Sequence, residues 1–582
     1  MKRPARLTWP WAAGAAVVLV AGGLSVALAT RNGDGGAVQS GFTGPVPTAA
    51  RPDVLAPAPT ATPAPAPAPA ATTPVAGDGG TASPSTTIAP TAPPANPDEI
   101  DARICGGAAL QGGPATYDEA RARYAGRSVV RVPPGDNGKL FDGTVADTVY
   151  WFEAGTHTLG RGEFAQLVAK PGDVFTGAPG AVLDGQRSNR YAFGGNVADV
   201  LIEYLTIANF VAPLNEGVVN HDSGNDWQIE HTTISGNDGA GMMAGARQHV
   251  RYSCLAENGQ YGFNAYQGGD GIAGLVFEHN EIAGNNTGDW ERKQKGCGCT
   301  GGGKFWSVVG ARITNNWVHD NRSVGLWADT NNVDFLFERN IVEGNDGVGI
   351  WYEISYNARI ALNLIARNGW AQGKIDQGAP APGVYLSEAG GDSRLPATNA
   401  GAAAIDITAN RFVDDYSGIT LYENANRFCN SNGNSSTGYC TPFVTKGVIA
   451  EPHDYTYGRP VNKAHPCNAP GIGGEPLYTD CRWRTQHVTV HDNDFSFDRS
   501  VVPCASEYCG VMALYVSGAD NQTWQPYRVA DVAKAVVGGQ DNRWRQNRYT
   551  GAWRFAVEFG DRTDWKDWQG RLAQDAESTY AG

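Results

Sequence analysis

The sequence predicts an all-β solenoid of the parallel β-helix type, and three features of the 582-residue chain lead to this prediction. A frame of the form Asn-x-(Ile/Val)-x-x-Asn recurs along the chain. The interval between neighbouring copies is nearly constant. Each interval contains short apolar runs of period two, separated by turns rich in Asn and Gly, which is the pattern of short strands rather than of helices.

The copies of the frame set the length of the repeat. Strict copies begin at Asn280, Asn316, Asn340 and Asn363, relaxed copies at Thr232 and Ser253, and later copies at Asn410 and Asn493. Thr232 and Ser253 are 21 residues apart, and the steps from Asn316 to Asn340 and on to Asn363 are 24 and 23 residues. We therefore expect a single-stranded solenoid with rungs of about 22–25 residues.

A stack of such rungs explains the frame. One rung with three short strands cannot bury its inward face alone, but stacked rungs make a continuous core and three parallel sheets. Turn asparagines at equivalent positions then hydrogen-bond from rung to rung along a ladder. A two-layer β-sandwich is the alternative fold, but it gives no reason for a fixed Asn frame.

A second repeat places reactive side chains on this scaffold. GLWAD (Gly325 to Asp329) returns as GIWYE (Gly349 to Glu353) after 24 residues, which is one rung. Equivalent residues then lie roughly 4.8 Å apart along the stack, with each Trp pointing outward and each acid beside it. The next two rungs continue the file with Tyr385 and Glu388, and then with Glu423, the glutamates being one place later in the following turn. We expect an exposed aromatic stripe flanked by an acidic stripe.

Cleavage of a glycosidic bond needs these residue types. Hydrolysis needs a carboxylic acid and a carboxylate, and elimination from a uronate needs a base and a charge that stabilises the developing anion. Flat aromatic faces suit sugar rings. The candidate catalytic residues are Asp329, Glu353, Lys304 and His319, and the candidate substrate-binding residues are Trp327, Trp351, Tyr385, Glu388 and Glu423.

Each candidate also has a purely structural interpretation. Asp329 and Glu353 would serve equally well to cap rung turns or to hold a cation, and they would be the ligands if calcium is used. The sequence indicates no cofactor beyond this calcium. Lys304, in GGGKFW, would then be an ordinary surface lysine, and His319, in VHDN, would close a turn. The aromatic stripe would be covered by the insertion at 287–303 or by the C-terminal tail.

The first part of the chain predicts export. A basic start is followed by an apolar run over residues 11–29 that ends in Ala-Leu-Ala, the layout of an export signal or an uncleaved membrane anchor within residues 1–30. Residues 31–99 are rich in Pro, Ala and Thr, cannot bury a core, and predict a disordered spacer. We expect a secreted or cell-surface protein whose N-terminal segment would provide any membrane association.

Residues 100–582 are predicted to form the β-helix domain, with disulfide-stapled insertions near 425–482 and a C-terminal cap. All ten cysteines follow the spacer, and in an exported chain most should be oxidised. Cys297 and Cys299 would pair with each other or with Cys105 or Cys254. Local disulfides are predicted for three close pairs, Cys429/Cys440, Cys467/Cys481 and Cys504/Cys509.

Charge narrows the range of partners. A formal net charge of −14 argues against nucleic acid. An anionic polysaccharide remains compatible with this charge, because a bound cation can bridge carboxylate to carboxylate. We expect a monomer.

The chain also resembles a known family. The residues that carry the resemblance are VYWFEAGTHTL, KPGDVFTGAPGAVLDG, the Asn frames, and the run from GGGKFW through NNWVHDNRSVGLWADTNN to GVGIWYEISYNA. They are similar to secreted right-handed parallel β-helix proteins of the pectate-lyase-like superfamily, in a subgroup mostly of unassigned substrate, over roughly Val129 to Thr550. The resemblance implies a right-handed β-helix and a carbohydrate target, and it implies no particular reaction.

Two features depart from the better-known members of that superfamily. The calcium-aspartate and arginine pattern of typical pectate lyases is not found in register. EPHD (Glu451 to Asp454) resembles a motif of β-helix alginate epimerases, but it lies in a Cys/Pro-rich insertion without the usual rung before it. We therefore expect an exported enzyme that cleaves a polysaccharide in a groove on the β-helix surface, as a glycoside hydrolase or a polysaccharide lyase. The alternative is a non-catalytic glycan-binding or adhesive surface protein.

Overall fold

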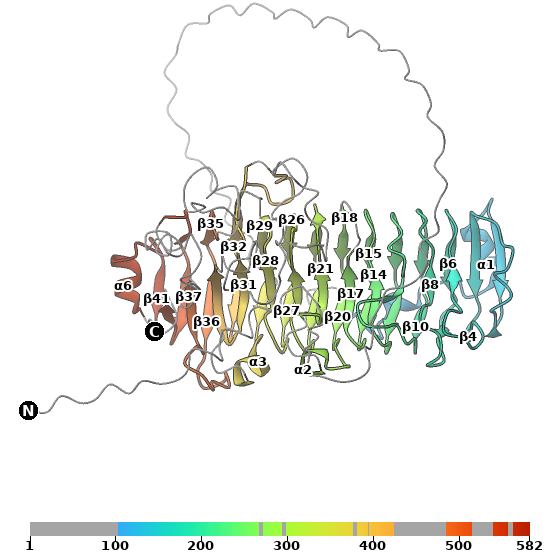
Figure 1. Ribbon diagram of the computed structural model, residues 1–582, viewed down its shortest axis with the longest axis horizontal. Helices are drawn as coiled ribbons and strands as arrows, with labels where there is room; N and C mark the ends of the chain where they lie inside the picture. The colour runs from blue at the N-terminus through green and yellow to red at the C-terminus, as the bar shows by residue number, and fades with distance from the viewer. Residues whose placement is uncertain are drawn as a thin grey trace, which may run out of the picture. The chain divides into compact units, whose positions relative to one another are not determined.

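A computed structural model describes residues 103–266, 272–293, 298–375, 381–393, 395–423, 485–514, 539–556 and 563–582. Within them the chain winds into a parallel β-helix in which most rungs contribute one strand to each of three sheets (Figure 1). The predicted three-strand rung is therefore confirmed. The predicted signal or anchor (1–30) and the spacer (31–99) lie outside the described residues. No helix in the described ranges is long and apolar enough to cross a membrane.

Sheet 1 holds the strands that open each rung. In stacking order its strands are β1 (Ser128–Val132), β3 (Thr148–Phe152), β6 (Val174–Gly177), β9 (Leu201–Glu203), β12 (Gln228–Glu230), β15 (His249–Arg251), β19 (Val276–Glu278), β23 (Arg312–Thr314), β26 (Val333–Glu338), β29 (Tyr356–Ala361), β32 (Ile405–Thr408), β35 (Val488–His491) and β38 (Arg543–Arg545). Two short strands extend it beside β26, namely β18 (Ile272–Ala273) and β22 (Val308–Val309).

Sheet 2 holds the second strand of each rung. In stacking order its strands are β2 (Gly135–Asp136), β4 (Gly155–Thr158), β7 (Ala181–Asp184), β10 (Thr206–Ala208), β13 (Thr233–Ser235), β16 (Cys254–Ala256), β20 (Glu281–Ala283), β24 (Trp317–His319), β27 (Ile341–Glu343), β30 (Leu364–Ala366), β33 (Arg411–Val413), β36 (Asp494–Phe497), β39 (Arg548–Gly551) and β41 (Thr579–Ala581).

Sheet 3 holds the third strand of each rung. In stacking order its strands are β11 (Gly217–Val219), β14 (Ala240–Met243), β17 (Tyr261–Ala265), β21 (Gly301–Phe305), β25 (Leu326–Ala328), β28 (Ile350–Glu353), β31 (Pro382–Ser387), β34 (Ser417–Tyr422), β37 (Val511–Leu514) and β40 (Arg554–Ala556). A separate two-stranded sheet pairs β5 (Leu167–Val168) with β8 (Phe193–Gly194).

Short helices accompany the strands. They are the 3-10 helix η2 (Ala108–Gln111) and the α-helices α1 (Tyr117–Arg123), α2 (Trp290–Lys293), α3 (Trp370–Ile375) and α6 (Trp565–Gly570). α1 and α6 lie at opposite ends of the stack (Figure 1). Trp568 of α6 is buried against Trp544 and Phe555 of the last rungs, with ring centroids 5.5 and 4.9 Å away.

Two ladders of buried amides tie the rungs together, as the Asn frame predicts. Along most of each ladder, the Asn Oδ1 accepts from both the backbone N–H and the Nδ2 of its equivalent one rung earlier, as between Asn340 and Asn316, where both distances are 3.0 Å. The ladder between sheets 1 and 2 consists of Asn280, Asn316, Asn340, Asn363, Asn410, Asn493 and Asn547. The ladder between sheets 2 and 3 consists of Asn237, Asn258, Asn285, Asn321, Asn345, Asn368 and Asp415.

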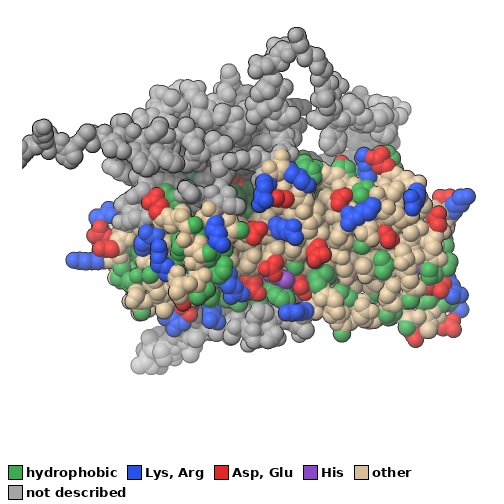
Figure 2. Space-filling view, turned by 90° about the horizontal axis from the view of Figure 1, so that it is seen from below, with side chains coloured by type: hydrophobic (Ala, Val, Ile, Leu, Met, Phe, Trp, Pro, Cys, Tyr) green, Lys and Arg blue, Asp and Glu red, His purple; other side chains and the backbone are tan. Residues whose placement is uncertain are grey.

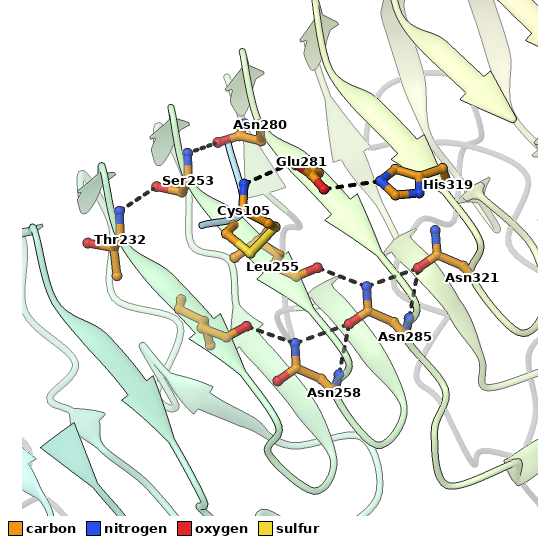
Figure 3. The surroundings of a disulfide bond; sticks show 12 residues. Cys105, Thr232, Ser253, Leu255, Asn258, Asn280, Glu281, Asn285, His319 and Asn321 are labelled. Atoms are coloured by element: carbon orange, nitrogen blue, oxygen red, sulfur yellow. Dashed lines mark hydrogen bonds and ion pairs between the residues drawn. A yellow bond between two sulfur atoms is a disulfide. The ribbon is translucent and has the colours of Figure 1, made fainter. Parts of the chain in front are cut away.

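The core lies inside the coil of the chain. Phe337, three residues before a frame, and Ile350, directly before the outward Trp351, are fully buried in it, as the register deduced from the frame requires. A Cys105–Cys254 disulfide ties the segment before η2 to β16 (Figure 3). The predicted Cys504–Cys509 bond is present, and Cys299 is also disulfide-bonded. Four predicted loop cysteines lie outside the described residues, namely Cys429, Cys440, Cys467 and Cys481.

One face of the β-helix carries acidic and basic side chains side by side in its described part (Figure 2). On sheet 1, opposite charges on neighbouring rungs pair across strands, as Arg251 does with Glu230 at 2.6 Å. These mixed surface charges therefore give no reason to expect a ligand of one charge.

Candidate functional site

The predicted file of aromatic residues lies on the outer face of sheet 3. Lys304, Trp327, Trp351 and Tyr385 are direct neighbours in register on β21, β25, β28 and β31. The rings of Trp327 and Trp351 stack with centroids 4.4 Å apart and planes 4° from parallel. Trp351 and Tyr385 stack at 5.0 Å. The spacing of one rung thus places these rings face to face.

The prediction that this aromatic stripe is exposed is wrong. Trp327 and Tyr385 are each only 2% exposed, and Trp351 alone of the three rings is partly exposed. They belong to an apolar cluster outside the main core, which also contains Val348 and Tyr508. Burying stacked indole surface is favourable by roughly 25 cal/mol per Å². Residues 298–300 of the predicted covering insertion also reach this face, at its Lys304 end.

The Gly that opens GLWAD and GIWYE is required by the second ladder. A Cβ at Gly325 would lie 2.6 Å from the carbonyl oxygen of Gly349 and 2.9 Å from the Nδ2 of Asn345. Gly349 meets the same two obstacles one rung later, from Gly383 and Asn368. The strand therefore enters sheet 3 close against the ladder, and this approach fixes where the outward Trp begins.

Asp329 directly follows β25 and is fully buried. Its Oδ2 lies 3.0 Å from the ammonium of Lys304. Its Oδ1 accepts from the backbone N–H and the hydroxyl of Thr330, at 2.8 and 3.0 Å. The ammonium of Lys304 also lies 3.9 Å from the centre of the Trp327 ring and donates to the carbonyl of Gly298 at 2.5 Å. Lys304 is thus enclosed by a carboxylate, a carbonyl and an aromatic face.

Glu353 ends β28 and is also fully buried. Its Oε2 accepts a 2.8 Å hydrogen bond from the indole N–H of Trp327. The face of the Trp327 ring therefore contacts the ammonium of Lys304, which pairs with Asp329. The edge of the same ring donates to Glu353. The structure brings together Lys304, Trp327, Asp329 and Glu353, as the rung spacing predicts.

The later acids of the file lie in the turns that follow their strands, again as predicted. Glu388 follows β31 and accepts from the hydroxyl of Ser387. Glu423 follows β34 and accepts from the backbone N–H of Thr485 at 2.7 Å and from the side chain of Gln540. Both glutamates are fully buried. Glu423 therefore helps to hold together three successive rungs.

His319 does not join this cluster. It ends β24 on sheet 2, and its Nε2 lies 3.2 Å from Glu281 while its Nδ1 lies 2.7 Å from Asp320 (Figure 3). Its ring stacks on Trp317 at 3.9 Å. His319 shares a rung with Trp327, but the two strands face different sides of the coil. The sequence spacing correctly predicted which rung holds His319, but it could not predict which sheet.

A protein-family model matches the middle of the chain. Residues 216–399 match a family model described as "Right handed beta helix region". This part of the chain is a right-handed β-helix. The resemblance to pectate-lyase-like β-helix proteins is thereby confirmed at the level of the fold. No protein among those with curated descriptions matches the chain.

Several solved structures are similar to this chain. The A-module of the mannuronan C-5 epimerase AlgE6 of Azotobacter vinelandii is 14% identical, with a TM-score of 0.35 over 53% of this chain and 88% of that one. Pectate lyase Pel9A is 12% identical, with a TM-score of 0.31 over 51% and 79% of the two chains. The periplasmic alginate epimerase AlgG is 11% identical, with a TM-score of 0.34 over 72% and 89%. At these identities, the activity has to be argued from the site itself.

A calcium ion does not fit the acid pair of this β-helix. Calcium takes six to eight oxygen ligands, whereas Asp329 already faces the ammonium of Lys304 and two donors of Thr330. In the described ranges no group of three or more His, Cys, Asp or Glu residues is arranged to hold a metal ion. No step of the chemistry below therefore passes through a metal.

Two residues of the same face were missed from the sequence. Trp306 and Tyr266 precede Asp329 by one and two rungs in the same column, since Ala265, Phe305 and Ala328 are in register. The signal was present for Trp306, because GGGKFW places it two residues after Lys304, as Asp329 stands two residues after Trp327.

Proposed function

We propose that this β-helix binds a polysaccharide on the outer face of sheet 3 and cleaves a glycosidic bond at Asp329 and Glu353. The observation that carries the proposal is the assembly of two buried carboxylates, one lysine and stacked indoles around Trp327. An ionised carboxylate and a proton-donating carboxyl are what glycoside hydrolysis requires. Stacked acids beside aromatic rings are not needed to complete a rung, because the next two rungs place Ser387 and Tyr422 at the position of the acid.

The two acids have different surroundings and so different roles. Asp329 lies 3.0 Å from the ammonium of Lys304, and we assign it the role of nucleophile or base. Glu353, one rung later, accepts from the indole N–H of Trp327, and we assign it the role of proton donor. Acids on adjacent rungs have Cβ atoms about 5 Å apart. Retaining enzymes hold their two carboxyl groups roughly 5–5.5 Å apart, so carboxyls that follow the spacing of the rungs would suit retention.

Elimination from a uronate is the second candidate reaction, and the position of Lys304 favours it. A buried ammonium beside a sugar site would neutralise the uronate carboxylate while a base removes the neighbouring proton. This role would require the substrate carboxylate to take the place of Asp329 beside Lys304. Hydrolysis needs no such exchange, and we therefore place it first.

Access to the acids has to come from the partly exposed members of the face. Asp329 and Glu353 are fully buried, whereas Trp351 is partly exposed. We place the approach of the sugar beside Trp351, with its ring contacting the apolar face of a sugar. A protein that only binds glycans would use the same aromatic surface without turnover.

The products released from a polysaccharide distinguish hydrolysis, elimination and binding without cleavage. The protein should be incubated with xylan, a β-glucan, polygalacturonate and alginate, and new reducing ends and ultraviolet absorbance should both be followed. Reducing ends without absorbance are expected, because hydrolysis leaves no double bond. Reducing ends with absorbance would identify elimination. Binding to one of these polymers without any product would identify a glycan-binding protein and contradict cleavage.

A further inference from the structure

One column of the sheet 3 face continues from the acid pair toward the N-terminal end of the stack. Asp329 donates its backbone N–H to the carbonyl of Phe305 at 2.9 Å, and Trp306 donates its own to the carbonyl of Ala265 at 2.9 Å. Tyr266, Trp306 and Asp329 are therefore equivalent residues of three successive rungs. Tyr266 lies two rungs, or about 10 Å, from Asp329 along the stack.

The members of this column differ in access to solvent. Tyr266 is 39% exposed, whereas Trp306 is 8% exposed and Asp329 is fully buried. The Tyr266 ring packs on Trp306 in a T-shaped contact, with centroids 6.2 Å apart and planes 68° from parallel. An exposed tyrosine is thus supported from one side by a buried tryptophan, and a supported ring loses little conformational freedom on binding.

We propose that Tyr266 is a sugar-positioning residue, and that the polysaccharide lies along the axis of the stack from Trp351 past Asp329 to Tyr266. This inference rests on the function proposed above. Tyr266 and Trp351 are accessible aromatic residues on opposite sides of the buried Lys304–Asp329 pair. An aromatic ring offers a flat apolar face to the C–H groups of a sugar and a hydroxyl to its polar edge.

The distance from Tyr266 to Asp329 defines which substrates should depend on this residue. A sugar in contact with Tyr266 cannot be the sugar that is cleaved about 10 Å away. The protein should therefore prefer polymers over short oligosaccharides. Loss of the Tyr266 ring should raise KM for a polymer and leave kcat nearly unchanged, because the ring binds ground state and transition state alike.

Affinity electrophoresis in native gels containing xylan, β-glucan, polygalacturonate or alginate tests this role separately from cleavage. Tyr266→Ala should weaken the retardation of the protein by a polymer about tenfold, and Tyr266→Phe should retain most of it. Val145→Ala, a change at another exposed apolar side chain far from sheet 3 in sequence, serves as the control and should behave as the wild type. Melting temperatures should be equal for all four proteins.

The outcomes separate the two proposals. Loss of retardation in Tyr266→Ala without any product from the wild type would keep Tyr266 as a sugar-binding residue and remove the cleavage proposal. Equal retardation of Tyr266→Ala and wild type would contradict the sugar-binding role of Tyr266 and would not affect the cleavage proposal. Failure of every polymer to retard the wild type would overturn the role of Tyr266 outright.

Discussion

The ammonium of Lys304 lies 3.0 Å from the carboxylate of Asp329, and both side chains are buried on the outer face of sheet 3. A buried ion pair of this kind costs free energy to desolvate, and that cost is recovered only while both partners are present. Lys304→Met would leave the buried carboxyl of Asp329 without its cation. We expect it to lower the free energy of unfolding by about 3–5 kcal/mol, measured by urea denaturation.

A double variant provides the control for this ion pair. Lys304→Met combined with Asp329→Asn removes both charges and should recover much of the stability lost in the single variant. Asp329→Asn alone completes the comparison, and a loss in the double variant equal to the sum of the two single losses would show that Lys304 and Asp329 do not interact energetically.

Gly325 and Gly349 each directly precede a strand of sheet 3, at positions that leave no room for a Cβ atom. Gly325→Ala should destabilise the protein by about 3 kcal/mol, because its Cβ would lie 2.6 Å from a carbonyl oxygen of the next rung. Gly162→Ala is the matched control, since no atom lies within 4 Å of its Cβ position. Its stability should stay within about 0.5 kcal/mol of the wild type. Thermal melts that rank the two variants in the opposite order would refute the close approach to the ladder.

Asp415 ends the described part of the second ladder where other rungs carry Asn. Its Oδ1 accepts from Asn368, but its Oδ2 is buried without a hydrogen-bond partner. Burial raises the pKa of Asp415 to about 7. The folded protein therefore holds a proton that the unfolded chain releases near pH 4, so stability falls as pH rises from about 4 to 7.

Asp415→Asn should remove this pH dependence. The amide cannot ionise, and its Nδ2 can donate to a carbonyl of sheet 2 as Asn368 does to Val342 at 2.9 Å. We expect a gain on the order of 3 kcal/mol at pH 8 and little change at pH 4. Urea denaturation at the two pH values checks this, and an equal gain at both would mean that Asp415 is ionised throughout.

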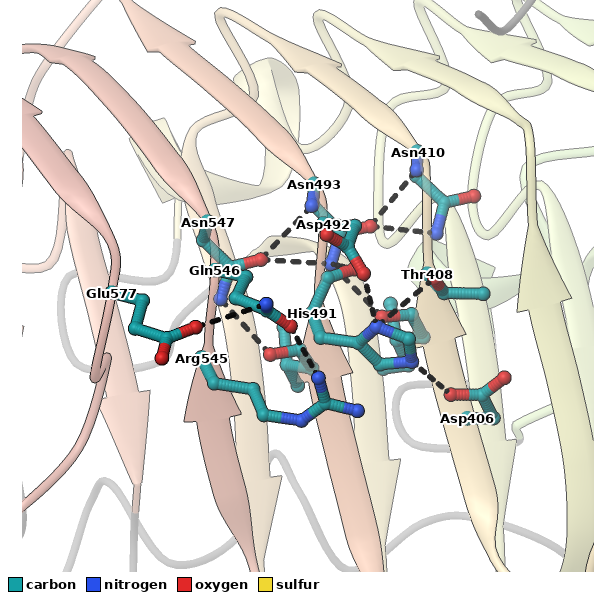
Figure 4. Close-up of polar contacts among 12 residues, drawn as sticks. Asp406, Thr408, Asn410, His491, Asp492, Asn493, Arg545, Gln546, Asn547 and Glu577 are labelled. Carbon is teal, nitrogen blue, oxygen red and sulfur yellow. Dashed lines mark hydrogen bonds and ion pairs between the residues drawn. The ribbon is translucent and has the colours of Figure 1, made fainter. Parts of the chain in front are cut away.

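The sequence VHDN occurs twice, and both copies hold a His between two carboxylates. In the second copy, His491 lies 2.8 Å from Asp406 on the preceding rung and 2.6 Å from Asp492 (Figure 4). Burial lowers the pKa of His491, but the hydrogen bonds with these two acids outweigh it, and the net shift is upward. The stabilisation from His491 is therefore complete below about pH 6.5 and is lost as pH rises through the folded-state pKa.

His491→Gln tests this pairing. The variant should lose about 1 kcal/mol of stability at pH 6 and almost none at pH 9, relative to the wild type at the same pH. His319→Gln should show the same pattern, because Glu281 and Asp320 likewise raise the pKa of His319 against the effect of its burial. A constant loss across this range would mean that neither pair depends on the imidazole charge.

The repeat could be predicted from the sequence, because its spacing is set by residues close together in the chain. Asn340 and Asn363 had to stack once their frame recurred at one rung, and Trp327 had to face Trp351 for the same reason. Burial of Trp327 could not be predicted, because it depends on residues distant in sequence, such as Tyr508, that join its apolar cluster. The bond from Trp327 to Glu353 also escaped prediction, since periodicity gives the side of a sheet but not the direction of an indole edge.

Two glutamates that each accept from a tryptophan allow a controlled test of catalysis at Glu353. Trp327 donates to Glu353 on sheet 3 at 2.8 Å, and Trp317 donates to Glu343 on sheet 2 at 3.0 Å, across the same two rungs. Both Glu→Gln changes therefore perturb a hydrogen bond from an indole, on different faces, and Glu343 also pairs with Arg367. The polymer that yields reducing ends with the wild type should be used for both variants.

The most direct measurement is the rate of reducing-end release by Glu353→Gln and by Glu343→Gln, with melting temperatures recorded for both. Glu353→Gln should lose at least about a hundredfold in kcat while remaining folded, because its amide cannot donate an acidic proton. Glu343→Gln should keep the wild-type rate. Equal rates for the two folded variants would contradict catalysis at Glu353.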